Sequence, residues 1–269
     1  MRLQVVYNLD TPKLPVEYRR GFVSLLKEAI KQANPTCFER YYSRLHTLKP
    51  FTFSVFFPEL TDNGGEDFYV GSKAVLYFST FFPELIASVY NGLMRIREYP
   101  IFGNKIRLHN IFLRPRIAIV EDRVRFKTMA PVLVNTKGNP NWYLLPGEKG
   151  FEDGLNFSVR EVCRVFLGMP DATVEFRPIA IRRKVVRHYN MHMQGLVGIF
   201  ELRGSPEVLD LIYRVGLGVR RSQGFGMLEV VLRCRTHRGG LNGRQGFGML
   251  EVVPMASRET SSTEETTHE

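Results

Sequence analysis

The stretch Gly216-Leu-Gly-Val-Arg-Arg-Ser-Gln-Gly-Phe-Gly226 is the most informative part of this 269-residue sequence. Its glycines are free to adopt positive φ angles and let the backbone approach a ligand closely. Arg220 and Arg221 lie between the two glycine pairs, and guanidinium groups suit phosphate oxygens. A helical pattern from Ser205 precedes the stretch, and a buried-strand pattern from Met227 follows it. The stretch therefore predicts a phosphate-binding loop between a helix and a strand.

The order of elements distinguishes this loop from two common phosphate-binding motifs. A dinucleotide-binding fingerprint runs from strand to helix, and Arg221 stands where its third glycine would be. A P-loop needs Gly-Lys followed by Ser or Thr, which the stretch lacks. The remaining alternative is an ordinary glycine-rich connector.

Upstream of the loop, the pattern from residue 121 onward predicts a βαββαβ unit. Residues 124–134 form a predicted strand, residues 136–150 a loop rich in Gly and Pro, and residues 155–167 an amphipathic helix. A strand pair is expected over 174–202, then the helix from Ser205 and a strand over 227–232. This order is that of a ferredoxin-like fold.

The first 120 residues show the same order of elements. Strands are predicted over 3–7, 51–57 and 106–120, with one or two more over 69–79. Helices are predicted over 18–33 and 83–93, with a shorter helical piece over 37–48. We therefore expect an α+β protein with two tandem ferredoxin-like (RRM-like) domains, residues 1–120 and 121–233.

The remaining residues, 234–269, differ in character. Residues 245–253 repeat residues 223–231 letter for letter, and a sheet has one position for its last strand, so the second copy is interpreted as a duplication. The end of the chain is rich in Thr, Ser and Glu, a composition typical of disorder. We expect a disordered tail outside the second domain.

The charge of the chain calls for an anionic partner. The net charge is +10, and the last 36 residues hold four Arg and five Glu, so the preceding 233 residues carry +11. The three cysteines are far apart in sequence and indicate neither a disulfide framework nor a zinc site. No signal-peptide pattern or long apolar run is present, so we expect a soluble cytoplasmic protein with no membrane association.

A basic chain with two ferredoxin-like units and aromatics among its basic helices favours RNA as the partner. Metal-assisted cleavage needs converging carboxylates, and the acidic cluster Asp62, Glu66 and Asp67 flanks Gly64-Gly65, as in a plain hairpin loop. We expect no metal and no other cofactor. The other route uses the ribose 2′-hydroxyl as nucleophile and needs a general base, a general acid and a cation.

His46 and Lys49 suit that second route. They lie three residues apart and would share one face if this piece were helical, with Tyr41 and Tyr42 close in sequence. From residue spacing alone, a functional role for His46 and an ordinary surface position are equally favoured. His188 and His192 are expected to share a strand face without a third metal ligand, so they are read as ordinary strand or RNA-facing residues.

The glycine-rich stretch resembles a family signature. It is similar to the C-terminal motif of CRISPR-associated repeat-processing endoribonucleases (the Cas-six family): Gly-hydrophobic-Gly, five residues including Lys or Arg, then Gly-hydrophobic-Gly. Leu217 and Phe225 fill the hydrophobic positions. Further similar stretches are Leu14-Pro15, Asn34-Pro35, Lys49-Pro-Phe-Thr-Phe-Ser54, Leu76-Tyr-Phe-Ser-Thr80, Pro83-Glu84 and Asn91-Gly92, so the resemblance covers roughly residues 1–232.

The resemblance implies metal-independent cleavage of CRISPR repeat RNA that leaves a 2′,3′-cyclic phosphate and a 5′-hydroxyl. It places the family's catalytic histidine at His46 and its lysine at Lys49, whereas Lys27 occupies the position of a tyrosine that some members carry. Tyr18, Tyr41 and Tyr42 are substitutes that the sequence does not separate. The candidate catalytic residues are His46, Lys49 and Tyr42. The candidate RNA-binding residues are Lys27, Arg40, Arg44, Gly216, Gly218, Arg220, Arg221, Gly224 and Gly226.

The same resemblance leaves an alternative function. Some members of the family lack the histidine and bind repeats without cutting them, so a non-cleaving repeat-RNA-binding protein is the second reading. A generic RNA-recognition motif is disfavoured, because residues 223–230 lack the basic first residue and later aromatics of its strand motif. The expected partner is precursor CRISPR RNA. A homodimer and association with a CRISPR interference complex are both compatible with the resemblance.

Overall fold

The alternating apolar residues at the start of the chain form the central strand of the first sheet. The structure, a computed structural model, describes residues 2–44, 47–62, 64–115, 117–136 and 138–231. In β1 (Arg2–Leu9), Leu3, Val5 and Tyr7 are buried. This strand pairs antiparallel with β5 (Lys73–Thr80) and β7 (Asn104–Arg114), and the full strand order is β3-β5-β1-β7-β6, with β3 (Phe51–Phe56) and β6 (Glu98–Ile101) at the edges.

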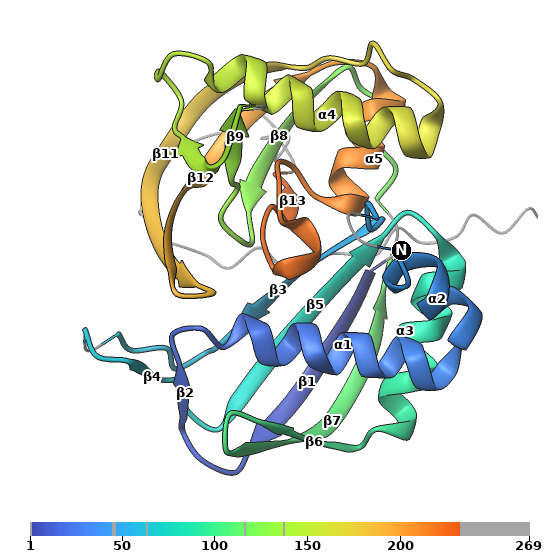
Figure 1. The fold of residues 1–269 in the computed structure, drawn as a ribbon, viewed down its shortest axis with the longest axis vertical. Helices are drawn as coiled ribbons and strands as arrows, with labels where there is room; N and C mark the ends of the chain where they lie inside the picture. The colour runs from blue at the N-terminus through green and yellow to red at the C-terminus, as the bar shows by residue number, and fades with distance from the viewer. Residues whose placement is uncertain (1, 45–46, 63, 116, 137, 232–269) are drawn as a thin grey trace, which may run out of the picture. The chain divides into compact units, whose positions relative to one another are not determined.

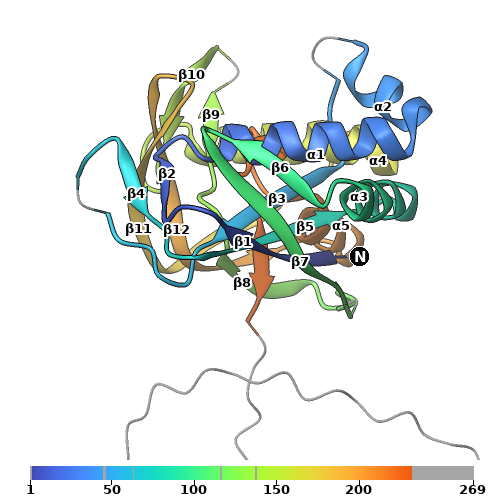
Figure 2. The ribbon, with the colours of Figure 1, turned by 90° about the horizontal axis from the view of Figure 1, so that it is seen from below.

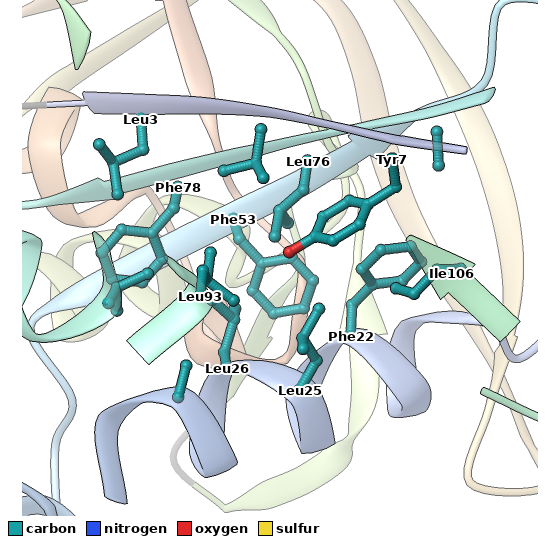
Figure 3. Packing of buried hydrophobic residues seen from close by; sticks show 14 of the residues in the cluster. Leu3, Tyr7, Phe22, Leu25, Leu26, Phe53, Leu76, Phe78, Leu93 and Ile106 are labelled. Atoms are coloured by element: carbon teal, nitrogen blue, oxygen red, sulfur yellow. The ribbon is translucent and has the colours of Figure 1, made fainter. Parts of the chain in front are cut away.

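Two amphipathic helices cover one face of this sheet. The buried stripes of α1 (Arg19–Ala33) and α3 (Pro83–Arg95) supply Phe22, Leu25 and Leu93 to the core, where they meet Phe53 and Phe78 of the strands (Figure 3). Both helices lie on the same side of the sheet (Figure 2). The short α2 (Pro35–Tyr42) follows α1 and is capped by the Asn34 side chain, which accepts a hydrogen bond from the Cys37 amide.

The second sheet repeats this topology. The elements β8 (Arg123–Thr128), α4 (Phe151–Leu167), β11 (Glu175–His188), β12 (Met191–Arg203), α5 (Pro206–Val215) and β13 (Leu228–Val230) follow one another in sequence (Figure 1). Their strand order, β11-β12-β8-β13, matches β3-β5-β1-β7 of the first sheet. Each half is therefore ferredoxin-like, and the predicted α+β fold is confirmed.

Two short strand pairs and one 3₁₀ turn complete the described elements. A small pair joins β2 (Lys13–Pro15) to β4 (Asp67–Tyr69), and a second joins β9 (Val134–Thr136) to β10 (Asn139–Leu144). One 3₁₀ turn, η1 (Arg221–Gln223), lies inside the glycine-rich loop. The β11–β12 ribbon turns through Tyr189 and Asn190, whose φ angles of 49° and 58° suit the right-handed twist of a tight hairpin.

Several predicted boundaries were wrong. The strand predicted over 106–120 ends at Arg114, directly before Pro115, which has no backbone N–H to offer the ladder, and it begins earlier, as half of a β6–β7 hairpin. The strand predicted over 124–134 ends at Thr128, and the predicted loop 136–150 contains β10. The helical piece predicted over 37–48 ends at Tyr42.

The two halves share one compact unit, residues 1–232. Each sheet has its own core cluster, but Leu48 and Phe81 of the first half pack against the second. The domain boundary predicted at residues 120/121 stays a prediction. The predictions for the tail, residues 234–269, concern residues outside the described ranges. No helix in the described part of the chain is long and apolar enough to cross a membrane.

Candidate nucleic-acid interface and active site

The glycine-rich loop is packed inside the protein, between the two halves. Gly216, Gly218, Gly224 and Gly226 are buried, with φ angles from 71° to 90°. A Cβ at Gly218 would lie 2.2 Å from the Leu133 carbonyl oxygen, and one at Gly226 would lie 2.1 Å from that of Leu217. The four glycines were predicted to contact RNA. Their close approach is to protein, to Leu133 and to Leu217 of the loop itself, and RNA contact by the four glycines stays a prediction.

Residues of the first half hold this loop in place. The Thr52 hydroxyl on β3 donates a hydrogen bond of 2.8 Å to the Phe225 carbonyl, and Arg19 Nε on α1 donates one of 3.2 Å to the Gly224 carbonyl. Beyond the ends of the loop, the Arg2 guanidinium donates hydrogen bonds to the Tyr213 and Leu228 carbonyls. Its Cζ lies 3.8 Å from the centroid of the Tyr213 ring. The loop therefore joins β3 and α1 to the second sheet.

The two arginines of the loop lie in different environments. Arg220 is half-buried, and its guanidinium donates 2.6 Å from Nε to the Tyr143 hydroxyl and 3.3 Å from Nη1 to the Gln223 side chain. Arg221 is buried, and burial lowers its pKa to about 10. Arg220 is partly exposed whereas Arg221 is buried, and contact of either guanidinium with phosphate stays a prediction.

A second cluster forms where α2 leads into β3. Lys49 Nζ lies 4.8 Å from the centroid of the Tyr42 ring, and Lys27 Nζ from α1 lies 5.6 Å from the same centroid. The Tyr42 ring also stacks on Phe38, with centroids 5.0 Å apart. Among the described residues, neither lysine has an ion-pair partner. The structure thus brings together three of the predicted site residues, Lys27, Tyr42 and Lys49.

The chemistry of this cluster follows from its burial. Lys49 is half-buried, and burial followed by the positive charge of Lys27 lowers its pKa. Burial raises the pKa of Tyr42, so this phenol stays protonated and is a poor general base. Tyr18 and Tyr41 are buried in the first core, whereas Tyr42 contacts Lys49. A negative charge beside Lys49 would be stabilised by two ammonium groups.

His46 lies outside the described residues, between Arg44 and Thr47. Thr47 to Lys49 are not helical, so the helix on which a shared face of His46 and Lys49 depended does not extend to Lys49. The Thr47 hydroxyl donates to the Arg44 carbonyl, and Lys49 Nζ lies 3.5 Å from the Thr47 carbonyl. Lys49 therefore lies in an irregular segment, residues 47–49, that leads toward β3.

The remaining predicted RNA contacts, Arg40 and Arg44, lie at the end of α2 and just beyond it. Both side chains are exposed. Arg40 forms an ion pair of 3.2 Å with Glu84 of α3, which partly neutralises it. Arg44 has no ion-pair partner among the described residues. Of the two, Arg44 is the freer cation for a phosphate.

The structure also shows a basic groove that the sequence analysis did not single out. Its volume is about 710 Å³, and it lies between residues 16–19 and 60–68 of the first half and β8, β11 and β12 of the second. Asp62 is its acidic lining residue, and Arg187 is paired with Glu66 at 3.4 Å. The signal in the sequence was the basic run of β11, Arg182-Arg-Lys-Val-Val-Arg187. The basic lining residues are Arg19, Lys127, Arg182, Lys184, Arg187 and His192.

The two histidines of the β11–β12 ribbon do not share a face. His188 is fully buried against the Phe225 ring, and His192 is exposed in the groove. They lie on different strands, because the chain turns at Tyr189 and Asn190. Within the described residues, no group of three or more His, Cys, Asp or Glu side chains could hold a metal ion.

Comparisons with known proteins agree with this architecture. The family model for CRISPR-associated protein Cas6, N-terminal, matches residues 13–111, and that for CRISPR associated protein Cas6, C-terminal, matches residues 114–230. The chain belongs to the Cas6 family. The family resemblance seen in the sequence is thereby confirmed.

Two Cas6 relatives match most of the chain. A protein of Pyrococcus furiosus named CRISPR-associated endoribonuclease Cas6 is 26% identical over 223 residues, which cover 81% of this chain and 84% of that protein. CRISPR-associated endoribonuclease Cas6 1 of Methanocaldococcus jannaschii is 25% identical over 246 residues, covering 85% and 92%. A solved structure from work on a Cas6-related gene of Pyrococcus furiosus shares the fold, with a TM-score of 0.75, 20% identity, and 86% of this chain and 98% of that chain covered.

Proposed function

We propose that this Cas6-family protein binds precursor CRISPR RNA and cleaves it within the repeat without a metal ion. The ribose 2′-oxygen attacks the adjacent phosphorus, a new P–O2′ bond forms, and the P–O5′ bond breaks. The products are a 2′,3′-cyclic phosphate and a 5′-hydroxyl. The proton of the 2′-hydroxyl passes to a base, and the 5′-oxygen receives a proton as it leaves.

The observation that carries this proposal is the placement of Lys49 and Lys27 against the Tyr42 ring. Phosphoryl transfer builds negative charge on the phosphorane oxygens, and cations fixed in a partly dry site stabilise that charge. Lys49 is half-buried and lacks an ion-pair partner among the described residues, so its charge is available to a phosphate. His46, three residues earlier, is proposed as the proton shuttle, because imidazole titrates near neutrality.

Tyr42 is assigned a positioning role. Its phenol has a raised pKa, so it does not take up the proton of the 2′-hydroxyl at neutral pH. Its ring instead attracts both ammonium groups, 4.8 Å and 5.6 Å away. Tyr42 thereby fixes Lys49 in the irregular segment that leads into β3.

The path of the RNA is proposed from the distribution of charge. The basic groove supplies several cations that face solvent, and Arg220 offers a guanidinium at the surface of the glycine-rich loop. Phosphate contacts of this kind dominate the affinity of proteins for nucleic acids. The buried glycines hold the loop in the conformation that presents Arg220, whose own φ is 55°.

The test is single-turnover cleavage of a CRISPR repeat RNA that the protein binds, in EDTA and in magnesium. We expect equal cleavage in both buffers and a product that carries a 2′,3′-cyclic phosphate. RNA with a single 2′-deoxy nucleotide before the cut should bind normally and resist cleavage. Cleavage that requires magnesium would contradict the mechanism. Tight binding of the all-ribose RNA with no cleavage would instead support the non-cleaving alternative.

A further inference from the structure

A second hollow lies on the outer face of α1, apart from the basic groove. Its volume is about 440 Å³, and it forms where three elements meet. These are α1, the β6–β7 turn and the β11–β12 turn, which lies in the other half of the protein. The residues that matter here are Arg20, Ser24, Lys27, Tyr99, Phe102 and Tyr189.

Two exposed aromatic rings in this hollow sit on unusual backbone. Phe102 and Tyr189 are 46% and 43% exposed, and both have a φ of 49°. Bulky L-residues rarely adopt this conformation, and Asn or Gly would fill such turn positions more easily. Of the four non-glycine residues with positive φ in the described chain, these two are the aromatic ones, and both line the same hollow. Strained residues of this kind gather at functional sites.

The walls of the hollow are fixed by specific contacts. A Cβ at Gly21 would lie 2.1 Å from the Ile101 side chain, so glycine here lets the β6–β7 hairpin dock directly on α1. The Ser24 and Tyr99 hydroxyls are 2.8 Å apart. These contacts place the β6–β7 turn, and Phe102 with it, beside α1.

The β11–β12 turn is fixed to the same helix. Glu17 accepts a hydrogen bond of 2.7 Å from the Asn190 amide and pairs with Arg20 at 3.0 Å. The Arg20 guanidinium in turn lies 4.9 Å from the centroid of the Tyr189 ring. The hollow is therefore built by both halves, with its rings held in place before any ligand binds.

The chemistry of the hollow selects its occupant. Arg20 and Lys27 are the charged side chains that line it, and both are basic. Exposed aromatic rings beside cations are the usual platform for an unpaired nucleobase, which stacks on the ring while its phosphate meets the charge. A peptide side chain would not need the two cations, and a duplex would not present an unpaired base.

Lys27 connects this hollow to the proposed active site. It lines the hollow, and its Nζ also lies 5.6 Å from the centroid of the Tyr42 ring, which Lys49 contacts as well. We propose that the hollow binds one unstacked nucleobase of the repeat RNA, within a few nucleotides of the cleaved phosphate, with Tyr189 and Phe102 as its stacking surfaces. This inference rests on the proposed function and adds a base-recognition site to it.

The test combines protein variants with abasic RNA. Tyr189→Asn and Phe102→Asn remove the rings and place Asn, which tolerates positive φ, at both turns, so the fold is retained. Affinity is measured on full-length protein with repeat RNA made non-cleavable by one 2′-deoxy nucleotide. The same RNA is then prepared with a single abasic site at each position in turn. Phe112→Thr and Tyr90→Ala are the controls, because their rings are similarly exposed (46% and 39%) outside the hollow.

We expect each ring variant to weaken binding of intact RNA by about tenfold, and both controls to change it by less than about twofold. An abasic site at one position near the cut should lower the affinity of wild type by about tenfold. The same abasic site should lower the affinity of the ring variants no further. If an abasic site at every position weakens binding to the ring variants as much as it weakens binding to wild type, the inference is overturned. RNA binding, and hence the proposed function, would then still stand. Failure of wild type to bind repeat RNA at all would overturn both.

Discussion

The Thr52 hydroxyl donates a 2.8 Å hydrogen bond to the Phe225 carbonyl and so ties β3 to the glycine-rich loop. Thr52 is three residues after Lys49, so this bond links the segment of the proposed active site to the loop that carries Arg220. Both partners are fully buried. The two halves of the protein therefore meet at a polar contact that water does not reach.

Thr52→Val should destabilise the protein, because it leaves the buried Phe225 carbonyl without its donor. The expected loss is about 1–3 kcal/mol in the free energy of unfolding, measured by urea denaturation. Thr52→Ser keeps the hydroxyl and serves as the control for the lost hydrogen bond. Equal stability of Thr52→Val and wild type would mean that the two halves do not depend on this bond.

Arg220 and Arg221 should respond differently to substitution. Arg220→Ala is expected to weaken RNA binding roughly tenfold and to reduce the slope of log affinity against log salt by about one, as for one lost phosphate contact. Arg221→Met should leave both quantities unchanged, because the Arg221 side chain is buried. Its Nη1 has no hydrogen-bond partner among the described residues, so the apolar replacement should not destabilise the fold by more than about 1 kcal/mol. A salt slope that falls in Arg221→Met would show that this side chain reaches RNA.

The pH dependence of cleavage should reflect the loss of the proton from the Lys49 ammonium. Burial and the nearby charge of Lys27 lower the Lys49 pKa, so its ammonium loses the proton at a pH below the ordinary lysine range. The single-turnover rate should therefore fall on the alkaline side, as the pH rises through that lowered pKa. Lys27→Gln removes the like charge and should move this fall to higher pH, whereas the control Lys31→Gln should not. An alkaline limb unmoved by Lys27→Gln would exclude Lys49 as the titrating group.

The stability of the fold should fall in mild acid because of His188. Burial, then the positive charges of Arg19 and Arg220, lower its pKa to about 4, against contributions from Gln223 and Glu17. The unfolded chain takes up the proton below about pH 6.5, but the folded state does so only near pH 4. The free energy of unfolding should therefore drop by up to roughly 3 kcal/mol between these values.

His188→Gln should flatten this slope, whatever its effect on absolute stability, and His192→Gln should not. Urea denaturation between pH 4 and 7 measures the slope for each variant. If the slope of His188→Gln matches that of wild type, another group causes the acid sensitivity.

His46→Ala should slow single-turnover cleavage by about 10²–10⁴-fold, the usual contribution of general acid–base catalysis. Affinity for the repeat should change by less than about threefold, since one exposed contact contributes little. Rates under single-turnover conditions separate chemistry from product release. Parallel loss of binding and cleavage would make His46 a contact residue, and normal cleavage would remove it from the mechanism.

The local patterns of the sequence determined the elements and their order. The helical spacing of Phe22, Leu25 and Ala29 and the alternation of β1 depend on each segment's own apolar residues, so the βαββαβ order was predictable in both halves. The glycine signature likewise identified the loop and the family from adjacent residues alone. Edge features such as the β6–β7 hairpin were missed, because short exposed strands carry a weak periodic signal.

Which side of each segment meets another segment was decided only by the tertiary structure. Arg220 and Arg221 are neighbours of the same charge, yet the packing of the loop inside the protein buries Arg221 and leaves Arg220 partly exposed. Lys27 and Lys49 are 22 positions apart and meet at the Tyr42 ring because α2 folds back beside α1. The burial of a side chain and its distance from another depend on contacts between segments that are far apart in sequence. Local sequence patterns therefore do not predict them.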